Sequence, residues 1–295
     1  MLLNYLDNGA YIPKMRSHGM VSAIEKRILE LGGRIEYNTR VEKILVNGGK
    51  VTGVETAKGD SVSTSHVICN SSPTIAYNKL IHPRSEAPEI AFKTVNMRRH
   101  GGAGFVVYLG LDAPIEKIGI TDYGYFISEG MDTDKIYASM GRLDVPDMQA
   151  TTCLNAAIPD ASPAGTTVLS MTTLFTPDVW DNVKPAEYFK LKNKIAGGMI
   201  GQFERCTGMK IRDKIEEIEV ATPQTFARYT RSYKGSIYAY EQDVWDYVIP
   251  RIIAAKDEKY IDGLSFVGGY AETGSGYSPS LMSGRAAGLE VAGKL

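Results

Sequence analysis

The sequence predicts an α/β protein whose middle has α+β character. Three observations lead to this class: an amphipathic helical segment after residue 19, closely spaced alternating segments typical of a β-meander, and a β-rich middle followed by a long helical segment. The middle differs in character from the pieces on either side of it. We therefore expect two domains, one formed by 1–83 together with 223–295 and one formed by 84–222.

Composition limits the class of protein further. The chain has 295 residues, is 43% hydrophobic and 23% charged, and carries a net charge of −1, so nucleic acid is not expected as a partner. No apolar run reaches the ~18 residues of a membrane span. Cys69, Cys153 and Cys206 lack disulfide-framework or zinc spacing, and the four histidines show no ligand spacing. We expect a cytoplasmic protein without a bound metal.

The first third of the chain reads as a helix followed by short strands. Residues 19–31 carry apolar side chains at helical spacing, and two glycines at 32–33 end the helix. A tight turn at Asn47-Gly48-Gly49 joins two alternating segments into a hairpin. Ser72-Pro73 starts a short helix that runs to Leu80. The strands expected in this part are RIEY (34–37), VEKILV (41–46), VTGVETA (51–57), DSVST (60–64) and HVICN (66–70).

The middle of the chain is rich in β-branched and aromatic residues, which favours strands. A longer helix is expected over 185–205, where Pro185 suits the first turn, and a small helix after Thr222-Pro223. This pattern predicts a mixed or antiparallel sheet with helices on one face. The strands expected here are AGFVVYLGL (103–111), YGYFIS (123–128), KIYAS (135–139) and GTTVLSMTTLF (165–175).

A glycine-rich loop near residue 270 is the strongest candidate for a binding site. The apolar run 264–267 leads into GGYAETGSGYSPS, with four glycines in the nine residues 268–276, and a small-residue helical segment follows Pro279. A strand, a glycine loop and a helix N-terminus together can cradle an anion or a cofactor. Taken alone, the loop is explained equally well by a sharp turn that needs glycine.

The order of the motifs resembles the phytoene desaturase, carotenoid isomerase and retinol saturase group of FAD-dependent oxidoreductases, within the amine-oxidase-like superfamily. AYIPKMRSHGM (10–20) is similar to that group's Pro-x-Gly-Gly-Met segment, without its first glycine. ATPQTFARYTRSYKGSIYAYE (221–241) resembles its Thr-Pro and Gly-x-x-Tyr segment, and the glycine loop resembles its C-terminal flavin-contacting motif. Residues 85–215 match only in general character.

The resemblance implies FAD as the cofactor and places residues around it. Val41 would lie by the adenine, and Ile68, Cys69 and Asn70 near the ADP moiety. A carboxylate near the flavin pyrimidine would oppose reduction, so we expect Glu272 to point outward into solvent. The residues implied to approach the ribityl chain, the phosphate and the ring are Gly268, Gly269, Gly276, Tyr277, Ser278 and Pro279.

Two further features carry open alternatives. The resemblance implies that Gly235 and Tyr238 pass over the flavin or a substrate tunnel, although this sequence has Tyr238-Ala239 where the group often has Tyr-Gly. Aromatic residues in a β-rich region are more often plain core or surface. Arg98 and Arg99 form either an anion site or a solvated charge pair, and we expect the second.

The group's opening motif, GxGxxG between a strand and a helix, has no match in this sequence. VNGGKVTG is a hairpin turn, HGGAGF precedes a strand, and GGMIGQ lies inside a helical pattern. We therefore expect the chain to be a truncated, C-terminal portion of a longer protein, through a shortened product, a split gene or a partial reading frame. FAD binding by this chain alone is then in question.

The resemblance implies a fragment of an FAD-dependent oxidoreductase that desaturates or isomerises a polyene, isoprenoid or similar apolar substrate, by hydride transfer to flavin N5. No catalytic side chain is identified. The alternatives are a non-catalytic lipid- or partner-binding domain and an amine or porphyrinogen oxidase of the same superfamily. The expected partner is an apolar small molecule. Peripheral membrane contact, a homodimer, and association through the incomplete cofactor face stay open.

Overall fold

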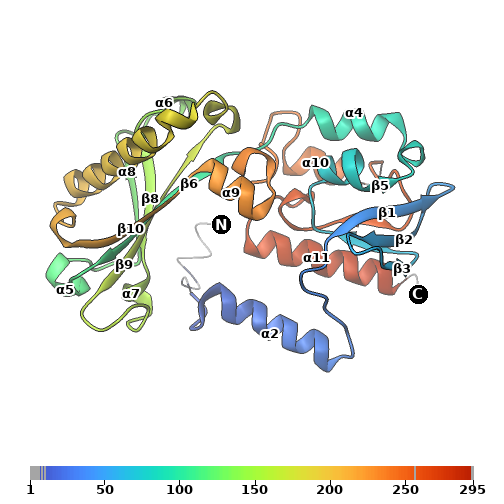
Figure 1. Cartoon of the computed structure of the whole chain (residues 1–295), viewed down its shortest axis with the longest axis horizontal. Helices are drawn as coiled ribbons and strands as arrows, with labels where there is room; N and C mark the ends of the chain where they lie inside the picture. Colours follow the sequence, from blue (N-terminus) through green and yellow to red (C-terminus); the bar gives the residue numbers. More distant parts are fainter. Residues whose placement is uncertain (1–6, 8, 10, 256, 294–295) are drawn as a thin grey trace.

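The computed structural model describes residues 7, 9, 11–255 and 257–293. Two lobes, each with its own hydrophobic cluster, lie side by side (Figure 1). The five-stranded lobe is built from residues 103–221. The split lobe is built from residues 41–97 and 236–293, which come from both sides of the five-stranded lobe in the sequence. The predicted α/β fold class is confirmed.

The β-hairpin of the split lobe forms as expected. β1 (Val41–Asn47) and β2 (Lys50–Thr56) pair antiparallel, with Asn47 opposite Lys50. The two turn residues, Gly48 and Gly49, have φ of 60° and 74°, a left-handed conformation that glycine adopts without steric cost. β3 (Ser61–Ser63) and β5 (Ile81–His82) complete a sheet in the order β3-β2-β1-β5.

A second, parallel sheet joins the two sequence pieces of the split lobe. β4 (Val67–Cys69) pairs with β11 (Leu264–Phe266), so that Ile68 lies opposite Ser265. The last helix, α11 (Tyr277–Ala292), runs below β1, β2 and β3 in the view of Figure 1. The other helical segments of the lobe are α3 (Pro73–Ile75), the π-helix η1 (Ala76–Leu80), η2 (Arg84–Glu86), α4 (Glu89–Met97), α10 (Val248–Ala254) and η6 (Gly268–Tyr270).

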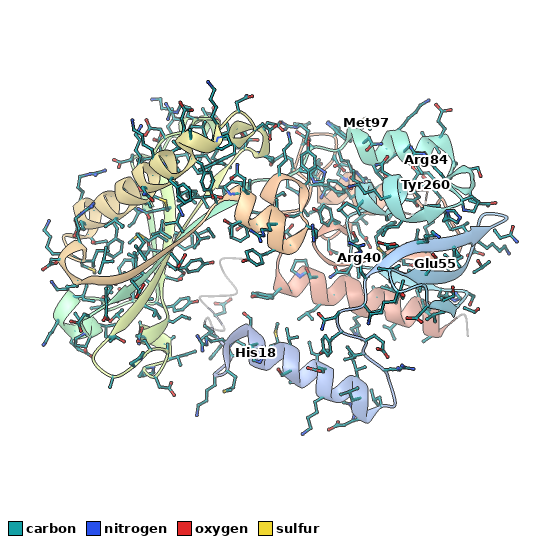
Figure 2. The ribbon with its side chains drawn as sticks, viewed as in Figure 1. His18, Arg40, Glu55, Arg84, Met97 and Tyr260 are labelled. Carbon is teal, nitrogen blue, oxygen red and sulfur yellow. The ribbon has the colours of Figure 1, made fainter. Side chains whose placement is uncertain are left out.

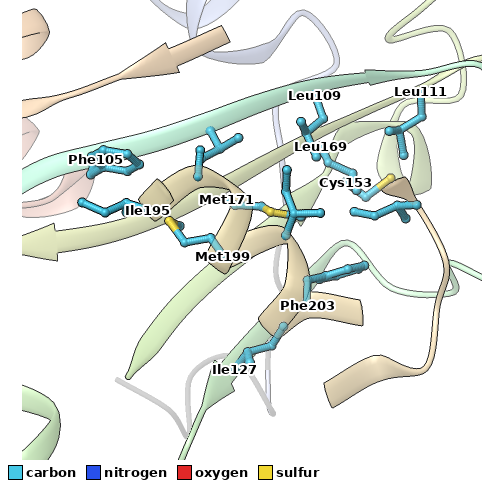
Figure 3. Close-up of a cluster of buried hydrophobic side chains, with 14 of the residues drawn as sticks. Phe105, Leu109, Leu111, Ile127, Cys153, Leu169, Met171, Ile195, Met199 and Phe203 are labelled. Atoms are coloured by element: carbon cyan, nitrogen blue, oxygen red, sulfur yellow. The ribbon is translucent and has the colours of Figure 1, made fainter. Parts of the chain in front are cut away.

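The five-stranded lobe is one sheet in the order β10-β6-β9-β8-β7, antiparallel throughout, which is one of the two expected arrangements. α8 (Pro185–Thr207) covers one face, and Met199 and Phe203 pack against strand residues such as Met171 (Figure 3). Its elements are β6 (Ala103–Leu111), α5 (Ile115–Ile118), β7 (Gly124–Ser128), α6 (Thr133–Ser139), β8 (Met148–Cys153), α7 (Leu154–Ala157), β9 (Thr167–Phe175), η3 (Pro177–Trp180), η4 (Arg212–Lys214) and β10 (Ile215–Ala221).

Two expected strands are wrong. KIYAS lies in helix α6, because the Asp132 carboxylate accepts hydrogen bonds from the backbone N–H groups of Asp134 and Lys135 and caps the helix. RIEY (34–37) is a loop that ends in a turn at Tyr37, and no described segment pairs with it. The expected first helix is present as α2 (Arg16–Glu30), but none of its residues is buried.

Two chain crossings hold the lobes together. The Gly101 N–H donates to the Ala239 carbonyl (2.7 Å) and the Ile237 N–H donates to the Gly102 carbonyl (2.9 Å), so the crossings run as a short antiparallel ribbon. α9 (Pro223–Thr230) and η5 (Tyr233–Gly235) lie between the lobes. The crossings therefore form a wall at the junction, next to the glycine loop.

Candidate functional site

A cavity of about 530 Å³ opens between the glycine loop, the first turn of α11 and the crossing segment 230–239. We call it the front cavity. Two of its walls come from sequence pieces that are about forty residues apart, and a third comes from the end of β4. Among the residues that line it are Asn70, Ile237, Ala239, Gly269, Tyr270 and Gly276.

Gly268 is fixed at the floor of the loop by its neighbours. Its φ is 84°, and a Cβ atom there would collide with the Asn70 amide oxygen. Its N–H donates to the Ser283 Oγ (3.0 Å), and the Ser283 hydroxyl donates to the Ser280 carbonyl (2.9 Å). The loop after β11 is therefore locked to both β4 and α11, and only glycine fits its first position.

α11 begins at the cavity. Gly276, with φ 128°, precedes its first turn, and Gly276 and Tyr277 both line the cavity. The first backbone N–H groups of a helix have no partner within the helix, and the helix dipole places partial positive charge there. The Tyr277 hydroxyl is hydrogen-bonded to the Ser17 hydroxyl (2.8 Å), which brings the start of α2 to this end of α11.

The opposite wall is the crossing segment. Ala239 has φ of 57°, a conformation that is unfavourable for alanine, and its Cβ lies 3.5 Å from where a Cβ on Gly269 would stand. The Ser275 hydroxyl donates to the Tyr238 carbonyl (2.8 Å). The glycine loop and the crossing segment are thus in direct contact across one edge of the cavity.

Neutral aromatic side chains stand behind the cavity. Tyr270 lies 4.9 Å from Tyr240 and 6.2 Å from His100, centroid to centroid, and His100 stacks on Tyr233 at 4.3 Å. Burial raises the pKa of Tyr270 to about 12 and lowers the pKa of His100 to about 4. Both side chains are uncharged at neutral pH, so this wall adds no charge to the cavity.

The structure brings together only part of the predicted set of site residues. Asn70, Gly269, Gly276 and Tyr277 line the front cavity. Ser278 and Pro279 lie in the first turn of α11, one or two residues further on. Val41 begins β1 in another sheet and is not among the described residues that line the cavity.

The other residues singled out in the sequence do not line the front cavity. The backbone of Gly235 packs so closely on Pro223 that a side chain there would collide with the Pro223 carbonyl. Ile68 is 43% exposed and Cys69 is buried. Glu272 is half-buried and lines a different cavity, so it points away from the front cavity but is not fully in solvent.

Arg98 was expected to be solvated, and this is wrong. Its side chain is only 9% exposed, and it pairs with Asp246 (3.2 Å) and Glu258 (2.9 Å), whereas the side chain of Arg99 is 62% exposed. The partners lie about 150 residues away in the sequence. Sequence reasoning also missed Ser283, for which the only signal was a serine one helical turn past Pro279. It noted Ala239 only as an alanine where the related group often has glycine.

The site has the geometry of a nucleotide or flavin cradle: a parallel strand, a glycine loop that allows close backbone approach, and a helix N-terminus aimed at the ligand. The absence of a side chain at Gly269 leaves backbone exposed to the front cavity, and the cavity is large enough for a ring system. The residues present fit a flavin, which Gly269, Gly276, Tyr277 and Asn70 would hold. This geometry is the one expected of part of a flavoprotein.

The chain belongs to the family of flavin containing amine oxidoreductases, which matches residues 3–189. This membership supports FAD as the cofactor. Curated relatives also confirm the resemblance to the phytoene desaturase, carotenoid isomerase and retinol saturase group.

Two relatives match most of the chain. An all-trans-retinol 13,14-reductase from Danio rerio is 26% identical over 279 residues, covering 86% of this chain and 44% of the relative. A 4,4'-diapolycopene oxygenase from Methylomonas sp is 25% identical over 278 residues, covering 94% of this chain and 54% of the relative. The chain thus spans about half the length of these curated relatives.

Solved structures share the fold. An oxidoreductase from Methanosarcina mazei matches with a TM-score of 0.62 at 18% identity, over 98% of this chain and 58% of that one. A reduced UDP-galactopyranose mutase matches with a TM-score of 0.60 at 12% identity, over 93% of this chain and 51% of that one. At these identities the likeness concerns the fold alone.

The part of the chain that the structure describes carries neither a membrane-spanning helix nor a metal-binding cluster. No helix in the described ranges is long and apolar enough to cross a membrane. No group of three His, Cys, Asp or Glu side chains in that part of the chain is placed to hold a metal ion.

Proposed function

We propose that this chain forms one part of an FAD-dependent oxidoreductase that desaturates or isomerises a polyene, isoprenoid or similar apolar substrate. The observation that carries the proposal is the Gly268 loop, locked by Asn70 and Ser283 at the start of α11 and open to the front cavity. Relatives named for retinol, prolycopene and phytoene support the substrate class.

The chain's own residues would hold and tune the cofactor. When bound, FAD supplies an acceptor for a hydride from a substrate C–H. The N-terminus of α11 would stabilise negative charge at the pyrimidine end of the ring, as a preorganised dipole. The uncharged Tyr270 and His100 would keep competing charge away from the ring.

The open face of the five-stranded sheet is the proposed substrate side. α8 covers the other face, and a cavity of about 410 Å³ lies over the open face, lined in part by Tyr108, Val168 and Ser170. We propose 84–222 as the substrate-binding domain, with 1–83 and 223–295 as a partial FAD-binding domain. Because Ala91 and Val95 of α4 pack in the split lobe, the structural crossing falls later, between Met97 and Ala103.

The FAD site would be completed by a further strand beside β4. The Val67 N–H donates to the Gly263 carbonyl (2.7 Å) and the Cys69 carbonyl accepts from Val267 (3.0 Å), so the backbone groups of Ile68 point away from β11. An open strand edge is a template for pairing. Association through this cofactor face, a homodimer, peripheral membrane contact and a cytoplasmic location all stay predictions.

The test uses the product of the complete coding region. We expect it to purify yellow and to act on polyenes, and we expect Gly269→Val or Ser278→Phe to weaken FAD binding. A colourless product that cannot bind added FAD would overturn the proposal. Turnover of amines or porphyrinogens instead of polyenes would keep the flavin and replace the substrate class. A colourless product that binds a lipid would favour the non-catalytic alternative.

A further inference from the structure

Residues 244–253 form an exposed apolar surface on the side of the split lobe that lies opposite α2 in Figure 1. The segment is a turn at Val244 and Trp245 followed by most of α10. We call the exposed surface of residues 244–253 the apolar tip. Its large exposed side chains are Val244, Trp245, Tyr247, Ile249, Ile252 and Ile253. Apolar side chains that gather in this way, unlike scattered single ones, mark a contact with a membrane or with another protein.

The aliphatic side chains of α10 share one face of the helix. Ile249, Ile252 and Ile253 are three and four residues apart, which places side chains on the same side of a helix, and each is more than half exposed. The single charged residue of α10, Arg251, is buried. The face of α10 that meets solvent is therefore apolar.

The only two charged residues of the segment are both buried and pair with each other. Arg251 donates to the Asp246 carboxylate through Nε (2.9 Å) and Nη2 (3.0 Å), and each of the two side chains is 3% exposed. Arg98, which follows Met97 (labelled in Figure 2) at the end of α4, also pairs with Asp246 (3.2 Å). These ion pairs fix the turn against α10 and α4, and they leave the apolar tip without an exposed charge.

An uncharged surface favours an uncharged partner. A charged partner would lose hydration against the apolar tip and would gain no ion pair there. Anionic lipids attract Lys and Arg side chains, and the apolar tip exposes neither. Hydrocarbon needs no counter-charge, and Trp and Tyr side chains are enriched where a bilayer meets water. Trp245 and Tyr247, next to the isoleucines, suit that position.

The size of the apolar tip also favours a bilayer over a stable protein partner. A stable protein–protein interface uses about 20–30 residues on each side, whereas the apolar tip has six large exposed side chains. Polar, exposed residues lie on both sides of it in the sequence, at Gln242 and Asp257. A bilayer needs less contact, since a single myristoyl chain already binds with a constant of about 10⁴ M⁻¹.

We propose that the apolar tip docks this chain on the surface of a zwitterionic lipid bilayer. Ile249, Ile252 and Ile253 would enter the boundary between headgroups and acyl chains, with Trp245 and Tyr247 at its polar edge. Because α10 has only seven residues, the contact would involve one leaflet. The proposal does not rest on FAD or on the proposed reaction, so it can hold or fail independently of the proposed function.

The test measures co-sedimentation of the chain with phosphatidylcholine vesicles, and with vesicles that also contain phosphatidylglycerol. We expect binding to both kinds of vesicle, with a constant on the order of 10⁴ M⁻¹. Because the apolar tip has no exposed charge, we expect the same binding at about 0.1 M and about 0.5 M salt.

Three substitutions locate the contact. Ile253→Asp places a charge in the apolar layer and should weaken vesicle binding at least tenfold. Val244→Asp should have the same effect from the turn, where the side chain is 93% exposed and the fold should tolerate the change. Ile24→Asp is the matched control and should leave binding unchanged, because this isoleucine is also exposed on a helix but lies on α2, across the split lobe.

Four results would overturn the proposal. Failure to bind at about 5 mM lipid would mean that the apolar tip does not enter a bilayer. Binding only to vesicles with phosphatidylglycerol would make the contact electrostatic. Undiminished binding by folded Ile253→Asp and Val244→Asp would place the contact elsewhere, on α2 if Ile24→Asp abolishes it. A dimer that Ile253→Asp disrupts, without vesicle binding, would make the apolar tip an interface between copies. If Ile253→Asp does not fold, Val244→Asp decides.

Discussion

Helices α8 and α2 have similar sequence patterns, but α8 packs against a sheet and α2 is exposed. α8 buries six residues against the five-stranded sheet, whereas α2 buries none. Ile24 and Ile28 of α2 are 44% and 39% exposed, and its C-cap residue Leu31 is 70% exposed. An amphipathic pattern therefore predicts a helix and its apolar face, but it does not show which surface covers that face. For α8 the cover lies within this chain, and the described residues provide none for α2.

The largest expected effect separates these two helices. Phe203→Ala in α8 removes a fully buried ring that lies 5.8 Å from Tyr125, centroid to centroid, and should cost about 3–5 kcal/mol of unfolding free energy. Ile28→Ala in α2 should change it by no more than ~0.5 kcal/mol. Urea unfolding of both variants measures the difference. Equal losses would mean that the apolar face of α2 is covered in solution.

The split lobe also contains a tightly packed segment, the glycine loop at Gly268, and glycine substitutions can test this packing. Gly268→Ala should destabilise by about 2 kcal/mol, because alanine resists φ 84° and its Cβ collides with Asn70. Gly284→Ala, in the helical part of α11 with open space around it, should stabilise by about 0.5–1 kcal/mol. Thermal unfolding of both variants measures these stability changes. Similar effects at both positions would contradict the tight packing of the loop around Gly268.

His100 gives the lobe junction a pH dependence. Burial lowers the pKa of His100 from 6.5 to about 4, so the unfolded chain binds a proton first as the pH falls. Stability is thus complete above pH 6.5 and is lost as the pH falls towards 4. Allowing for solvent around the half-buried ring, we expect a loss of about 1 kcal/mol between pH 7 and pH 5. His100→Phe should abolish this part of the dependence, and an unchanged profile would rule out His100 as its source.

The smallest expected effect is at Ala239. Glycine there would relieve the left-handed conformation, worth about 1–2 kcal/mol, and lose about 0.4–1 kcal/mol through a freer unfolded chain. The net expectation for Ala239→Gly is a gain of roughly 0.5 kcal/mol. Chemical denaturation can resolve it. A clear loss would indicate that the Ala239 methyl group contributes packing against Gly269 that outweighs its strain.

Local signals predicted the local structure well. The Gly48-Gly49 turn, β6, β9 and α8 follow from residue patterns that need no distant partner. Strand β10 was missed because IEEIEVA carries three glutamates, which are tolerated at a sheet edge exposed to water. Helix α6 was predicted as a strand because its side chains favour strands. The Asp132 cap stabilises the helix instead.

The candidate site was only partly predictable, because only its local features leave a pattern in the sequence. The glycine loop is contiguous, so its pattern is visible in the sequence. The partners that fix it, Asn70 and Ser283, and the crossing wall at Ala239 become neighbours only in the folded chain. The ion pairs of Arg98 span about 150 residues, and no spacing rule connects their members.

The central claim is that the Gly268 loop and the start of α11 form the FAD site. Titration of the product of the complete coding region with FAD, followed by flavin fluorescence, tests it directly with Gly268→Val and Ile28→Ala side by side. The account predicts saturable binding by the unmodified product, at least tenfold weaker binding by folded Gly268→Val, and no change in Ile28→Ala. Equal FAD affinity of the unmodified product and Gly268→Val would contradict it.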